Sequence, residues 1–252
     1  MASFVLVHGA FVGGWCWEPL RPLLDELGHE TSAPDLPGSG ADQTPVADVT
    51  LDECAERVCA ALELTEAPAI LVGHGMGGMV ITQAAALCPE RIARLVYLTA
   101  FLPRDGQSLL ELTQLPEGSG DQVQANLTIE DRPAVGALTD KALAHALFNR
   151  ATQRQLAWAL ERVRSQPLAP FLEPVHLGRS ALDPAKRIYI RCAQDHAIPP
   201  ALQRRMTDDS PCAEVHELDT DHSPFLTATG RLARLLDQIA GLPPTREAAP
   251  RY

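Results

Sequence analysis

The sequence lacks any concentration of positive charge. It carries 21 lysine and arginine residues against 32 aspartate and glutamate residues, which gives a formal net charge of -11 over 252 residues. Because nucleic acid is bound by a basic face that neutralises phosphates, we expect no nucleic-acid partner. The chain also lacks an apolar run of membrane-spanning length and a basic, apolar leader, so we expect no membrane partner and a cytoplasmic location.

Motifs for metals and cofactors are also missing. The six cysteines form no C-x-x-C pair and have no histidines at ligand spacing; they are Cys16, Cys54, Cys59, Cys88, Cys192 and Cys212. This scatter predicts unpaired cysteines in a reducing compartment and no metal site. The Gly-rich segment at 73–78 lacks the later acidic partner of a dinucleotide-binding motif, and no phosphate-binding loop of the G-x-x-x-x-G-K type occurs, so we expect no cofactor.

Short apolar runs alternate with longer amphipathic stretches along most of the chain. The expected strands are 4–7, 29–33, 69–72, 94–100, 187–192 and 214–218. The expected helices between and after them are 18–27, 51–64, 76–87 and 224–240. This alternation predicts an α/β fold with a mostly parallel sheet and helices on both faces.

The alternation stops in the middle of the chain. Residues 104–183 contain no convincing buried strand, but they include helical stretches at 143–148 and 153–164. An insertion of this kind between strands predicts a small helical lid. The expected organisation is therefore a core formed by 1–103 and 184–240, a lid at 104–183, and a flexible tail at 241–252.

The most informative motif is the segment Ile70 to Met79, in which a buried strand enters a Gly-flanked turn and then a helix. This is the strand–turn–helix setting of the G-x-S-x-G nucleophile elbow, whose middle residue points toward the substrate. Here the middle residue is Gly75, which has no hydroxyl group. The residue after the elbow, Met76, and the loop 8–10 after the first strand are expected to give one backbone donor each to an oxyanion hole.

The expected base and acid follow later in the chain. His222 lies between the last strand and the last helix, and Asp195 follows the strand at 187–192. Both positions are at carboxyl ends of strands, where α/β sheets bind their ligands. Because the chain order nucleophile, acid, histidine is the order expected for this architecture, we interpret Asp195 as the acid that orients His222. Three other acidic residues compete for that role: Asp105, Asp219 and Asp221.

These motifs together resemble one known family. The chain is similar to the plant methylesterase and hydroxynitrile lyase group of α/β-hydrolases and to its bacterial esterase relatives. The resemblance covers nearly the whole chain and is carried by the segments 4–10, 13–17, 73–79, 100–103 and 221–225. It implies the α/β-hydrolase fold, His222 and Asp195 as base and acid, Ala10 and Met76 as oxyanion donors, and a homodimer.

Two departures from the family pattern bear on the reaction. Hydroxynitrile lyases of this group have a threonine after the first-loop histidine and a lysine after the catalytic histidine. The corresponding residues here are Gly9 and Ser223, so cyanohydrin cleavage is not expected. Family esterases carry a serine at the elbow, where this chain has Gly75. That glycine has three interpretations: a natural functional residue, a knock-out of a serine esterase, or the mark of a relative that only binds its ligand.

We predict an enzyme that uses a His222–Asp195 general base, without an acyl-enzyme, on a small apolar carbonyl compound of aromatic or polyketide-like type. Cofactor-independent oxygenation, C–C cleavage and lyase or cyclase chemistry all fit this description. The alternatives are a methylesterase-like ester hydrolase that has lost its serine, and a non-catalytic binding protein. The expected substrate contacts, with packing or structural roles left open for some of them, are His8, Gly9, Trp17, Trp158 and Phe171.

Overall fold

The computed structural model describes residues 1–131, 134–178 and 183–242. Its centre is a six-stranded sheet with the order β2-β1-β3-β4-β8-β9, in which every recorded pairing is parallel. The strands are β1 (Ser3–Val7), β2 (Glu30–Ser32), β3 (Ala69–Gly75), β4 (Ile92–Ala100), β8 (Arg187–Cys192) and β9 (Glu214–Leu218). The sheet confirms the predicted α/β fold.

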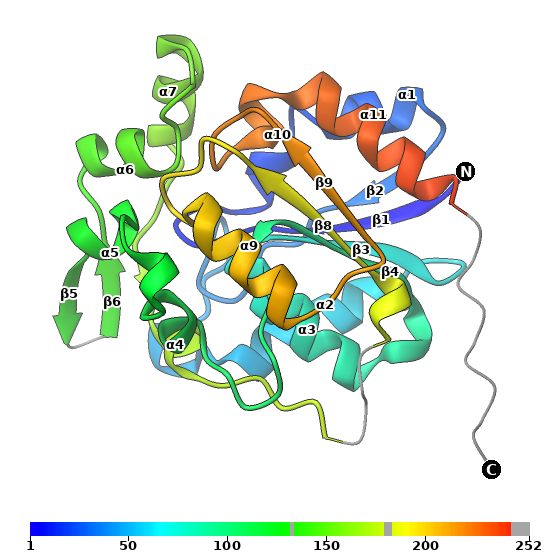
Figure 1. Ribbon diagram of the computed structural model, residues 1–252, viewed down its shortest axis with the longest axis horizontal. Coiled ribbons are helices and arrows are strands. Elements are labelled where there is room, and N and C mark those ends of the chain that lie inside the picture. The colour runs from blue at the N-terminus through cyan, green and yellow to red at the C-terminus, as the bar shows by residue number, and fades with distance from the viewer. Residues whose placement is uncertain (132–133, 179–182, 243–252) are drawn as a thin grey trace.

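Helices cover both faces of the sheet (Figure 1). One face carries α2 (Leu51–Glu63), α3 (Gly77–Leu87) and α9 (Pro200–Asp209), and the other carries α1 (Arg21–Glu26) and α11 (Thr229–Ala240). Alternating side chains of one strand enter separate cores: Val5 and Val7 pack toward α2 and α3, whereas Phe4 and Leu6 pack toward α1 and α11. The central strands β1, β3 and β4 are buried on both faces and are mostly apolar, whereas the edge strands β2 and β9 are partly exposed and carry polar residues.

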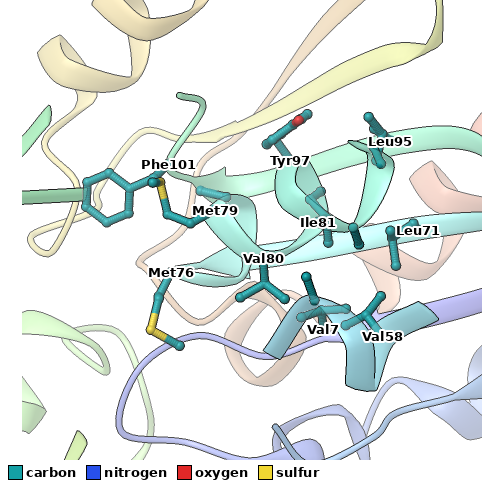
Figure 2. Packing of buried hydrophobic residues seen from close by; sticks show 14 of the residues in the cluster. Val7, Val58, Leu71, Met76, Met79, Val80, Ile81, Leu95, Tyr97 and Phe101 are labelled. Atoms are coloured by element: carbon teal, nitrogen blue, oxygen red, sulfur yellow. The ribbon is translucent and has the colours of Figure 1, made fainter. Parts of the chain in front are cut away.

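The core on the α2 and α3 side extends to the carboxyl edge of the sheet. Figure 2 shows Val80 and Ile81 of α3 in one cluster with Leu71 of β3, with Met76 and Phe101 at one end of the cluster. Met76 and Phe101 also line a pocket at that edge. The tight packing of α3 onto the sheet therefore fixes the backbone that borders the pocket.

Two parts of the core differ from the expectation. The predicted helix at 224–240 is divided into α10 (Pro224–Thr227) and α11, because Ala228 has non-helical backbone angles (φ -138°, ψ 27°). The Thr227 hydroxyl bonds to the Asp221 side chain and the Ser223 carbonyl, which ties α10 to the loop that carries His222. Helix α9 was not expected from the sequence.

The inserted segment, called the lid below, lies on the side of the sheet where β8 and β9 end (Figure 1, green). Its helices are α4 (Leu109–Thr113), α5 (Gln122–Asn126), α6 (Asp140–Ala146), α7 (Gln153–Leu160) and α8 (Ala169–Leu172). The expectation that it would contain no convincing buried strand is wrong, because β5 (Thr128–Asp131), β6 (Ala134–Ala137) and β7 (Gln166–Pro167) form an antiparallel sheet in which β6 and β7 have buried residues. These strands have two to four residues and include a glycine and a proline, which removes the usual sequence signal.

Short 3₁₀ turns complete the backbone, at Gly14–Trp17, Val46–Asp48, Pro89–Arg91, Pro116–Gly118 and Pro184–Lys186. Most of the predicted flexible tail, from 243 to 252, lies outside the described residues. No helix among the described residues combines the length and the apolar character needed to cross a bilayer.

One pair of cysteines overturns the expectation that all six are unpaired. Cys59 of α2 and Cys88, directly after α3, form a disulfide whose Cα atoms are 6.1 Å apart. The pair was not apparent from the sequence because its members are separated by 29 positions and only the packing of α2 on α3 brings them together. The other cysteines are free, and Cys212 is the one of them that is not buried.

We expect Cys59→Ser to lower the free energy of unfolding by about 2–4 kcal/mol, because the disulfide restricts the unfolded chain. Urea denaturation followed by circular dichroism measures this difference. Cys212→Ser is the matched control and should leave the midpoint nearly unchanged. A wild-type midpoint that a thiol reductant does not lower would contradict the prediction.

Candidate active site

The turn between β3 and α3 forms a sharp elbow at Gly75. Gly75 has φ +55°, a left-handed conformation that glycine adopts without strain. A close approach of helix and sheet surrounds it: a Cβ on Gly78 would lie 2.0 Å from the carbonyl oxygen of Phe101. Only glycine at position 78 permits this contact. The glycines of this segment are therefore explained by the tight turn.

His222 faces the elbow. It lies in the loop between β9 and α10, and its Nε2 atom is 3.2 Å from the point where a Cβ on residue 75 would be. Its backbone carbonyl accepts a hydrogen bond from Nε2 of His74, at 2.7 Å. Burial and the neighbouring His222 hold the pKa of His74 well below its usual value, so His74 is a neutral donor that fixes this loop.

Asp195 orients the His222 ring. Its Oδ2 atom lies 2.7 Å from Nδ1 of His222, and both side chains are almost completely buried. The other oxygen, Oδ1, accepts the backbone amides of Ala197 and Ile198 at 2.7 and 2.9 Å. Because these donors favour the charged carboxylate, Asp195 can hold the proton of His222 on Nδ1 and leave Nε2 free to act as a base.

The three competing acids have other partners. Asp105 accepts the amide of Leu177, and Asp219 bonds to Arg150. Asp221 is buried and accepts the amide of Arg150 at 2.9 Å, so it joins the lid to the histidine loop. Among the described residues, Asp195 is the carboxylate that contacts the His222 ring.

Two backbone amides are available beside the elbow. Ala10 and Met76 both line the pocket, and no hydrogen bond recorded among the described residues uses the amide of either one. A buried amide without a protein partner is costly unless a ligand or water accepts from it. Phe11, the residue after Ala10, has the strained value φ 66°. These amides therefore form a donor pair suited to a developing oxyanion.

The pocket under the lid is predominantly apolar. The empty space inside the pocket and its open mouth together is about 600 Å³. Apolar side chains from the lid and the core form most of its wall, among them Phe101, Leu109, Leu127, Leu147, Phe171 and Ile198. Its polar side chains are Thr113, Asp121, Gln124 and His222. An apolar acyl or aromatic group can therefore be buried here, with a reacting carbonyl at His222.

The structure places some of the predicted substrate contacts in the pocket wall and others outside it. Phe171 lies in the pocket wall, whereas His8, Gly9, Trp17 and Trp158 are not among the lining residues. Nδ1 of His8 donates to the carbonyl of Gly9 and its Nε2 accepts the amide of Leu36, so this ring supports the oxyanion loop.

The two tryptophans occupy packing positions. Trp17 is fully buried, with its ring edge-on to those of His74 and Phe225 at 6.3 and 5.2 Å. Trp158 packs on Trp15 at 5.1 Å. Trp17 therefore lies behind the elbow, in the core that supports the histidine loop.

Two residues of the site have no distinctive sequence signal. Thr99, at the end of β4, has φ 37°, and its hydroxyl donates to Oδ2 of Asp195. Such strain in a non-glycine residue is typical of functional sites. Asp121 belongs to the lid and lines the pocket. A threonine in an apolar strand and an aspartate in a polar loop are common, and only the fold brings them to His222 and Asp195.

Among the described residues, no group of three or more histidine, cysteine, aspartate or glutamate side chains is placed to hold a metal ion. Comparisons with known proteins show similarity to one family. Residues 4–235 match the model of the family described as Alpha/beta hydrolase family. The chain is 35% identical over 251 residues to "Putative methylesterase 11, chloroplastic" of Arabidopsis thaliana, which covers 96% of this chain but only 64% of that protein.

Solved structures show the same similarity. A pyrethroid hydrolase from Sphingobium faniae JZ-2 superposes with a TM-score of 0.87 at 26% identity, covering 96% of this chain and 98% of that one. Tomato methylketone synthase I, solved in complex with 2-tridecanone, superposes with a TM-score of 0.82 at 26% identity, covering 95% and 97% of the two chains.

Proposed function

The chain belongs to the alpha/beta hydrolase family, and on that basis we propose that it hydrolyses carboxylic esters of small apolar acids with a water molecule, activated by His222, in place of a serine nucleophile. The observation that carries the proposal is the position of His222 Nε2, which faces a Gly75 elbow without a hydroxyl group. A water molecule in the space of the missing side chain is within reach of this base.

The proposed reaction uses groups already described. Nε2 of His222 removes a proton from water while the water oxygen forms a bond to the ester carbonyl carbon. The oxyanion that results accepts hydrogen bonds from the amides of Ala10 and Met76. The imidazolium, stabilised by Asp195, then returns its proton to the departing alkoxide as the C–O bond breaks, which leaves a carboxylic acid and an alcohol.

The relatives support an ester substrate. One carries the name "Putative methylesterase 11, chloroplastic", and another is described as a pyrethroid hydrolase. The apolar wall of the pocket supports an acyl group with little polarity.

Two observations favour a second candidate function. The first is Gly75 at the elbow, and the second is the similarity to tomato methylketone synthase I, whose structure holds an aliphatic ketone. Without a nucleophile, the His222–Asp195 pair can remove a proton from a bound phenol, enol or carbonyl compound. The anion can then undergo C–C cleavage, cyclisation or reaction with oxygen, all stabilised by the same two amides.

The test is the hydrolysis of aryl and methyl esters by the protein as it stands. We expect a linear release of product from p-nitrophenyl acetate, with no burst and no acyl adduct in the intact mass. Esters of phenylacetic and hexanoic acid extend the test to apolar acyl groups. If none of these esters is cleaved faster than in buffer, ester hydrolysis is excluded, and product analysis with β-keto acids and phenolic ketones then tests the second function.

A further inference from the structure

One carboxyl group in the pocket has no part in the proposed reaction. Asp121 is only 6% exposed and lies in a wall that is otherwise mostly apolar. Thr113 and Gln124, also from the lid, line the pocket with it. A buried acidic side chain in an apolar wall is costly unless it serves a ligand or a fixed partner.

One of the two oxygen atoms of the Asp121 carboxyl group fixes its position. Its Oδ1 atom caps α5 by accepting the amides of Val123 and Gln124 at 2.7 and 3.0 Å. Among the described residues, no donor reaches Oδ2. The next residue, Gln122, donates its amide to the carbonyl of His196 at 2.9 Å, which anchors the lid to the loop that carries Asp195.

We propose that Asp121 is a specificity-determining residue whose free oxygen accepts a hydrogen bond from a hydroxyl group of the substrate at the lid side of the pocket. The substrate class is then a hydroxylated aromatic or aliphatic ester with its carbonyl carbon at His222. Thr113, Asp121 and Gln124 also line a hollow on the outer surface of the lid, so a polar group at this end remains close to solvent. The inference rests on the proposed function only for the placement of the ester carbonyl.

The electrostatic surroundings make this contact sensitive to pH. Burial and the charge of Asp195 raise the pKa of Asp121 to about 6, against the lowering effects of its two amide bonds and of His222. The titratable groups that face Asp121 are Asp195 and His222 from the core, with His196 beside the anchoring hydrogen bond. The carboxylate accepts a hydroxyl above this pKa and becomes a weaker acceptor below it.

Binding of an uncleavable ligand tests the proposal. The probes are 4-phenylbutan-2-one and its 2-, 3- and 4-hydroxyphenyl derivatives, with dissociation constants from calorimetry at pH 7.5. At least one hydroxylated isomer should bind about tenfold more tightly than the parent ketone. Asp121→Asn retains a good helix cap and should reduce this preference at least fivefold without weakening the parent ketone.

The matched control is Thr139→Asn, which changes the cap of α6 and does not line the pocket. This variant should keep the full preference. The wild-type preference should decrease from pH 7.5 to pH 5, whereas that of Asp121→Asn should not. No preference in the wild type, or the same preference in Asp121→Asn, would overturn the proposal. Because binding is measured without turnover, a failure of ester hydrolysis cannot be mistaken for this result.

Discussion

Gly75→Ser is expected to raise the hydrolysis of p-nitrophenyl acetate by at least about 100-fold and to introduce a burst of p-nitrophenol. The Cβ of the new residue would lie 3.2 Å from Nε2 of His222, so its hydroxyl would be within hydrogen-bond reach of the base after a shift of a few tenths of an ångström. The backbone at position 75 is already left-handed, as a nucleophile elbow requires. A covalent acyl-enzyme then divides the reaction into two easier steps.

The matched control for the serine variant is Gly75→Ala. It adds the same Cβ and the same backbone strain but no nucleophile, so it should show no burst and should lose activity as the methyl group displaces water. Stopped-flow absorbance measures the burst and intact mass spectrometry detects the acetyl adduct. A serine variant that behaves like the alanine variant would show that the elbow and His222 are not aligned for acyl transfer.

The second large effect is expected for His222→Ala, which should reduce turnover by about 10²–10⁴-fold, the usual contribution of a general base. Asp195→Asn should produce a loss of similar size. An asparagine leaves the position of the ring nearly unchanged, but its amide donor favours the wrong tautomer of His222. Steady-state rates with the substrate of the wild-type protein measure both losses.

His216→Ala is the control for these two variants. His216 lies on β9 and pairs with Glu214, away from the pocket, so its loss should leave the rate within about twofold of the wild type. If His222→Ala retains full activity, no reaction that depends on a general base at this position can be correct. The binding-protein interpretation instead predicts no product in any assay, and a ligand affinity that His222→Ala leaves unchanged.

The central strands of the core were predictable because they are buried on both sides. The strand at Arg187–Cys192 forms at the residues expected from its apolar and β-branched composition, and the strand at Glu214–Leu218 also forms at its expected residues although it is partly exposed. The lid sheet could not be predicted in this way. Ile129 of β5 is 59% exposed, so this strand has no buried face to give a periodic pattern.

For the site, the sequence supplied the local motifs but not the contacts between distant segments. The elbow around Gly75 consists of consecutive residues. Its glycines indicate a tight geometry that only glycine allows. Thr99 and Asp195 are 96 positions apart, and their contact depends on the packing of β4 beside β8. Asp121 reaches the pocket only because the lid folds back on the acid loop. Trp17 was an ambiguous candidate because a buried tryptophan in a core and one at a pocket mouth have the same local sequence.

The left-handed backbone at position 75 also affects how readily the chain tolerates mutation. A side chain held at this conformation costs on the order of 1 kcal/mol, which glycine avoids. The present chain therefore keeps the arrangement of base, acid and amide donors while retaining a margin of stability that a serine enzyme of the same fold would lose. Such a margin lets the lid accumulate destabilising substitutions, so new substrate preferences can arise there before any change at the elbow.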